Sequence, residues 1–145
     1  ISDAGIAAMA GSDTVGILLP GTILFLAKPH YAPARRMIDA GCAVAIATDF
    51  NPGSCYTQSM TLVMTLACAQ MKMRAEEVIT AATINPAFSL QLDGEVGTLH
   101  PGKRADLCVL DLPSWRAVGY AFGGNPVVMT VKNGVPIVAN VTEQN

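Results

Sequence analysis

The residues of this chain best suited to chemistry lie in residues 49–54, which read DFNPGS. Asp49 offers a carboxylate that can bind a metal ion or take a proton, and the following proline and glycine let backbone groups approach a ligand closely. Asn51 and Ser54 add an amide and a hydroxyl to the same turn. The alternative is a purely structural role, in which Asp49 caps the next helix and residues 51–54 only make a turn, because Asp, Asn and Ser are ordinary capping residues.

The elements around this loop place it at the end of a buried strand. Residues 43–48 read AVAIAT, a run without polar alternation that is typical of a strand covered on both faces. Upstream, the sequence predicts a strand at 15–19, a loop at 22–31 and a helix at 33–40. This order indicates a parallel βαβ unit, and ligands of parallel α/β sheets gather at the carboxyl ends of the strands, where Asp49 lies.

Downstream of the loop, the pattern predicts helices and then a small β module. A helix is expected over residues 57–72, a second from residue 75, and a short third over residues 86–92. Glu76 and Glu77 are expected to be solvated in the first turn of the second helix. After residue 93 we expect a strand at 105–111 and a hairpin of residues 127–132 and 135–139 around an Asn-Gly turn. The predicted fold class is therefore α/β, followed by β strands.

Composition excludes several classes of protein. The 145 residues are 51% hydrophobic and only 14% charged, against about 25% charged in typical soluble domains. This composition resembles the inside of a larger structure, and the chain opens at Ile1 in mid-pattern, so we expect a fragment. The net charge of -2 without a basic run argues against a nucleic-acid partner, and no apolar run is long enough for a membrane span.

Cysteine and histidine usage adds further limits. The four cysteines form no C-x-x-C pair, which excludes a zinc ribbon, and their use fits a reducing cytoplasm. Cys55 is expected to reach solvent in the loop, whereas Cys42, Cys68 and Cys108 are expected to be small buried hydrophobes. The two histidines, His30 and His100, are too few for a hydrolytic metal site within this chain.

Longer motifs indicate a family. Residues 97–111 read GTLHPGKRADLCVLD and resemble the G-x-L-x-x-G-K-x-A-D-L-V-V-x-D signature of the amidohydrolase superfamily, in which the chain passes from a metal-dependent TIM barrel into a β-sandwich. VKNG at 131–134 resembles the closing hairpin of that sandwich. LLPG at 18–21, ATDFNPGS at 47–54, NPA at 85–87 and GNP at 124–126 resemble the imidazolonepropionase family. The resemblance covers essentially the whole chain as the last third of such an enzyme.

The resemblance implies a division of the chain and roles for its residues. Residues 1–93 would be the C-terminal part of the (β/α)8 barrel, and residues 94–145 the C-terminal strands of the sandwich. Asp49 would be the catalytic metal ligand for one zinc or iron ion, whose other ligands lie outside this chain. Asn51, Gly53 and Ser54 would bind the substrate. The two histidines match no ligand position of the family.

The implied activity is hydrolysis of the cyclic amide 4-imidazolone-5-propanoate to N-formimino-L-glutamate in histidine degradation, in the cytoplasm. The implied partners are this small substrate and the rest of the same enzyme, and a homodimer is left open; this stretch alone is expected to be inactive. One alternative is another cyclic amidohydrolase or an aminohydrolase such as guanine deaminase. A second alternative is a non-catalytic relative, against which Asp49 argues, because degenerate relatives tend to lose metal ligands.

Overall fold

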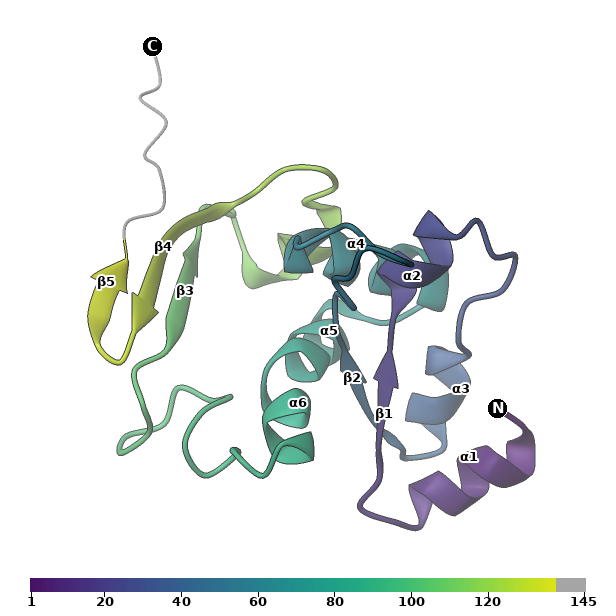
Figure 1. The fold of residues 1–145 in the computed structure, drawn as a ribbon. Coiled ribbons are helices and arrows are strands. Elements are labelled where there is room, and N and C mark those ends of the chain that lie inside the picture. Colours follow the sequence, from purple (N-terminus) through teal and green to yellow (C-terminus); the bar gives the residue numbers. More distant parts are fainter. Residues whose placement is uncertain (138–145) are drawn as a thin grey trace.

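The computed structural model describes residues 1–137, which form two small sheets with helices packed around the first (Figure 1). The elements in chain order are α1 (Asp3–Ala10), β1 (Val15–Leu18), α2 (Pro20–Phe25), α3 (Ala34–Asp39), β2 (Ala43–Ile46), α4 (Met60–Met71), α5 (Ala75–Ala82), α6 (Ile84–Ser89), β3 (Leu107–Leu110), the 3-10 helix η1 (Trp115–Tyr120), β4 (Val127–Lys132) and β5 (Val135–Ile137). Among these residues, no helix combines the length and apolar character needed to cross a membrane.

The first sheet is the predicted βαβ unit. β1 and β2 pair in parallel, with Gly16 opposite Val44. The three residues after Ala43 in β2 are all buried, which confirms the expectation of a covered strand. The core lies between this sheet and the helices that contact it, with Met37 of α3, Val63 of α4 and Val78 of α5 among its buried members.

The predicted loop over residues 22–31 is wrong at its start, because α2 runs from Pro20 to Phe25. Proline suits the first position of a helix, since its fixed φ matches the helix and its missing N–H would have no partner there. Thr22 to Phe25 then supply side chains that a helix tolerates. α2 follows the carboxyl end of β1 directly (Figure 1). Its first turn contacts Asp49 through the hydroxyl of Thr22.

The helices after the loop follow the predicted order with shifted ends. α4 begins at Met60 because the Ser59 hydroxyl caps it, accepting a hydrogen bond from the Leu62 N–H at 3.2 Å. Its predicted apolar face is confirmed by the burial of Val63, Ala67 and Met71. α6 begins before the proline that was expected to open it.

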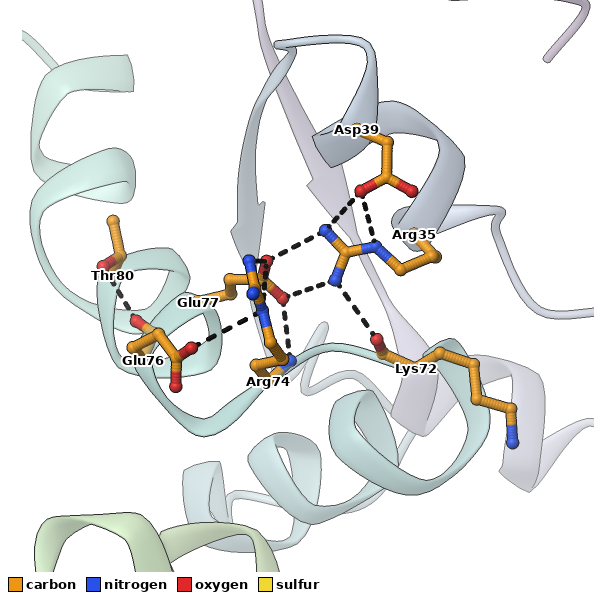
Figure 2. A network of polar contacts seen from close by, with 7 residues as sticks. All are labelled: Arg35, Asp39, Lys72, Arg74, Glu76, Glu77 and Thr80. Atoms are coloured by element: carbon orange, nitrogen blue, oxygen red, sulfur yellow. Dashed lines mark hydrogen bonds and ion pairs between the residues drawn. The ribbon is translucent and has the colours of Figure 1, made fainter.

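Glu77 of α5 is not solvated as expected, but forms the centre of an ion-pair network shown in Figure 2. Both terminal guanidinium nitrogens of Arg35 reach the Glu77 carboxylate, at 2.8 and 2.9 Å, and Arg74 contributes its backbone N–H at 2.8 Å and its guanidinium at 2.6 Å. The hydrogen bonds from Arg35, ahead of those from Arg74, lower the pKa of Glu77 to about 2. Residue spacing does not reveal this contact, because Arg35 lies on α3, 42 residues away along the chain.

The second sheet has the order β3-β4-β5 and is antiparallel. Asn133 and Gly134 have positive φ values of 50° and 77°, as the predicted hairpin turn requires. Residues 138 and 139 of the predicted second hairpin strand lie outside the described residues. Cys108 of β3 is exposed, against the expectation of burial, because in residues 1–137 no element covers that side of the strand.

The segment that carries the second sheet also packs against the helices around the first sheet. The 3-10 helix η1, which lies between β3 and β4, contacts α4 and α5 of the first part. Val118 is buried there, and a Cβ on Gly119 would lie 2.7 Å from the Sγ of Cys68, so only glycine allows this approach. A boundary near residue 93 therefore stays a prediction about the full-length protein.

Candidate active site

The candidate site is the loop that leaves the carboxyl end of β2, next to the first turn of α2 (Figure 1). The loop closes on itself through an isolated bridge: the Asn51 N–H donates to the Cys55 carbonyl at 2.8 Å, and the Cys55 N–H returns a longer bond of 3.4 Å to the Asn51 carbonyl. The four residues singled out by the sequence thus lie in or beside one closed turn.

Asp49 does not cap the next helix, because Ser59 does so. Its Oδ2 instead accepts a hydrogen bond from the Thr22 hydroxyl at 2.8 Å and a longer one from the Ser54 hydroxyl at 3.4 Å. Within residues 1–137 no hydrogen bond reaches Oδ1. Asp49 also has a φ of 52°, in the left-handed region that is unfavourable for a residue with a Cβ. The loop therefore holds Asp49 in an unusual backbone conformation, with its Oδ1 free of hydrogen bonds within the described residues.

The side chain of Asn51 organises the turn. Its Oδ1 accepts from the N–H groups of Gly53 and Ser54, each at 2.9 Å. Its Nδ2 donates to the Asp49 carbonyl at 2.6 Å and to the Ser54 hydroxyl at 2.9 Å. These bonds fix the amide to the loop, and the contact with the Asp49 carbonyl supports the left-handed conformation described above.

Gly53 and Ser54 contribute different groups. Gly53 is exposed, and a Cβ there would meet only the Asn51 Oδ1, at an ordinary contact distance of 3.4 Å. Ser54 is half-buried and holds its hydroxyl between Asn51 and Asp49. The hydroxyl of Ser54 thus links the Asn51 amide to the Asp49 carboxylate within the turn.

Two contributions to the site were missed by sequence reasoning. Thr22 was assigned to a loop, and Cys55 was expected to face solvent but is 1% exposed. Cys55 is buried because α2 packs on it: a Cβ on Gly21 would lie 3.0 Å from its Sγ. The signal for Thr22 was present, since parallel strands end at one edge and Thr22 follows the end of β1 as Asp49 follows the end of β2.

The described residues offer one candidate metal ligand, Asp49, but not a complete set of ligands. Within residues 1–137, no three His, Cys, Asp or Glu side chains gather as a metal site would require, and His30 and His100 are exposed. Asp49 nevertheless fits the role of a single ligand, because one of its oxygens has no hydrogen bond in the described part of the chain. Carboxylate oxygens are accepted ligands of zinc and of iron.

Comparison with known proteins identifies the class. Residues 5–137 match the amidohydrolase family, and the chain therefore belongs to it. Two structures share its fold: an adenosine deaminase from Xanthomonas campestris with bound zinc (TM-score 0.85, 24% identity, 95% of this chain and 35% of that one) and the guanine deaminase of E. coli (TM-score 0.77, 19% identity, 97% and 38%). At these identities the likeness concerns the fold alone.

Within the family, the chain is similar to imidazolonepropionases. It is 51% identical over 140 residues to the imidazolonepropionase of Porphyromonas gingivalis, which covers 97% of this chain and 33% of that relative. The chain thus spans about a third of the length of the curated relatives it matches. The family resemblance read from residues 97–111 is confirmed by this finding and by the family match.

Proposed function

We propose that the full-length protein is an imidazolonepropionase, which opens the ring of 4-imidazolone-5-propanoate by hydrolysis and yields N-formimino-L-glutamate. The observation that carries the proposal is the 51% identity over 97% of the chain to an enzyme of that name. The identity to the E. coli guanine deaminase is 19% over the same share, so an aminohydrolase role is not favoured.

In this proposal Asp49 is both metal ligand and base. Its Oδ1 would hold one zinc or iron ion, and the remaining ligands would come from outside this chain. Such an ion, when bound, supplies Lewis-acid activation of the water that attacks the substrate. The Asp49 carboxylate would accept the proton of that water and return it to the ring nitrogen as the C–N bond breaks.

The turn after Asp49 would bind the substrate. We assign Ser54 to the ring and Asn51 and Gly53 to the product, through the Ser54 hydroxyl, the amide of Asn51 and the exposed backbone at Gly53. The support is that all three lie in the closed turn that follows Asp49, at the carboxyl ends of the strands, where ligands of parallel α/β proteins bind.

The proposal extends to the larger architecture. Residues 1–93 would complete a (β/α)8 barrel, and residues 94–145 would contribute strands to a β-sandwich. The parallel pairing of β1 with β2 and the antiparallel order β3-β4-β5 support this division. We place the enzyme in the cytoplasm, with the substrate and the rest of the same enzyme as its partners.

The test is an assay of the full-length protein on 4-imidazolone-5-propanoate and on guanine, with metal analysis of the same sample. Turnover of the imidazolone and about one zinc or iron per chain are expected. Turnover of guanine alone would show that the protein is an aminohydrolase. A sample that turns over neither substrate although it is folded would support the non-catalytic alternative.

A further inference from the structure

Thr22 makes the shortest hydrogen bond to the Asp49 side chain. The distance from Thr22 Oγ1 to Asp49 Oδ2 is 2.8 Å, the usual length for an O–H···O bond, and the two residues are 27 positions apart. The other hydroxyl within reach, that of Ser54, lies 3.4 Å from the same oxygen and is also engaged with Asn51 at 2.9 and 3.2 Å. Thr22 is therefore the main hydrogen-bond partner of this carboxylate within the described residues.

The hydroxyl of Thr22 is itself held in place. Thr22 is half-buried in the first turn of α2, and both preceding residues, Pro20 and Gly21, are buried. Gly21 packs on Cys55, so α2 is fixed against the same loop that carries Asp49. Threonine is β-branched and has few side-chain rotamers, which further limits where its hydroxyl can point.

We propose that Thr22 is a positioning residue for Asp49: its hydroxyl holds Oδ2 and so presents Oδ1 to the metal. The inference rests on the proposed function, because it takes Asp49 as a metal ligand. Oδ2 is engaged from α2, whereas Oδ1 has no hydrogen bond within residues 1–137. The left-handed backbone at Asp49 sets the direction of its Cβ, and the contact with Thr22 sets the rotation of the carboxylate.

In this proposal Thr22 affects metal binding, whereas other residues contact the substrate. Groups that hydrogen-bond a metal ligand orient it, and their loss typically lowers metal affinity or activity about 10–100-fold. Thr22 would act on the metal and on the reacting water through Asp49 without touching the substrate. Loss of the hydroxyl should therefore lower metal affinity and kcat but leave KM nearly unchanged.

The test compares Thr22→Val and Thr22→Ser in the full-length protein. Valine keeps the branched shape and removes the hydroxyl, whereas serine keeps the hydroxyl and removes a methyl group. Thr130→Val, in β4 and outside the site, is the matched control. Each variant is measured for metal affinity against a chelator, for the visible spectrum of the cobalt-substituted protein, and for kcat and KM; thermal melting reports folding.

We expect Thr22→Val to bind metal about 10–100-fold more weakly, with a changed cobalt spectrum and a KM within about twofold of the wild type. Thr22→Ser should recover most of the affinity and the wild-type spectrum. A Thr22→Val protein with wild-type affinity and spectrum would overturn the inference, as would a Thr22→Ser protein as impaired as the valine variant. If the wild type binds metal but does not hydrolyse the imidazolone, the proposed function fails while affinity and spectrum still decide the role of Thr22.

Discussion

Replacement of Asn51 by Ala in the full-length protein tests how the turn serves the site. The substitution removes two short acceptor contacts, from the N–H groups of Gly53 and Ser54, a longer one from the Ser54 hydroxyl, and two donor contacts, to the Asp49 carbonyl and the Ser54 hydroxyl. At about 0.5–1.5 kcal/mol net for each bond, and with water replacing the exposed ones, the turn loses about 2–4 kcal/mol of local stability.

This loss of local stability is comparable with the energy of the left-handed backbone conformation at Asp49, which the turn stabilises. A residue other than glycine in the left-handed region costs about 1–3 kcal/mol, and the Asn51 amide bonds the carbonyl of the residue that bears this strain, Asp49. Without the amide, other loop conformations compete with the active one. We expect kcat/KM to fall about 10–100-fold, which corresponds to about 1.4–2.8 kcal/mol, the lower part of the estimated loss. The core is not involved, so the melting temperature should change by only a few degrees.

The assay measures kcat/KM, bound metal and thermal melting for Asn51→Ala, Asp49→Ala and Asn125→Ala. Asp49→Ala should abolish activity and weaken metal binding, whereas Asn51→Ala should keep metal because the ligand remains. Asn125 is a matched control, since its side chain accepts a bond from the Val127 N–H in a similar local turn outside the site. Full kcat/KM in Asn51→Ala, or metal loss as complete as in Asp49→Ala, would refute the reasoning.

Three further outcomes are expected. Gly21→Ala places a Cβ 3.0 Å from the Cys55 Sγ and should cost about 1–3 kcal/mol of stability, whereas Gly94→Ala enters open space and should not; chemical denaturation of both decides. The lowered pKa of Glu77 means that its ion pairs stabilise the fold above about pH 4.5 and that this contribution is lost as pH falls toward about 2. Glu77→Gln should therefore lower the free energy of unfolding at pH 7 by about 1–3 kcal/mol, and its difference from wild type should shrink at pH 3; an equal difference at both would contradict the assignment. The isolated 145-residue chain should hold no stoichiometric metal and show no turnover, because Asp49 is a single ligand.

The sequence predicts well those features that depend on neighbours along the chain. The apolar run of β2, the methionine-bearing face of α4 and the Asn133-Gly134 turn each carry a local pattern, and each is confirmed. Asp49, Asn51, Gly53 and Ser54 were expected to act together because they lie within one stretch of six residues, and the hydrogen bonds among them depend on that spacing.

The features that the sequence did not predict depend on contacts between distant segments. Glu77 is drawn out of solvent by Arg35, which lies on another helix. Cys55 is buried by α2, and Cys108 is exposed because no described element covers it. The pattern of residue types indicates which side chains can be buried. Which element buries each of them depends on how the helices and strands pack.

The site depends on local contacts and on contacts between distant segments, and only the part that depends on local contacts could be predicted from the sequence. The turn of Asn51 and Ser54 forms from local bonds and fixes the backbone at Asp49, whereas the direction of its carboxylate depends on Thr22, which arrives from the end of the neighbouring strand. Parallel pairing of β1 and β2 brings the first turn of α2 and the loop after β2 to one edge. In the proposed site, the orientation of Asp49 as a metal ligand depends on both strands, so the unit expected to present Asp49 is the βαβ unit together with the loop that follows it.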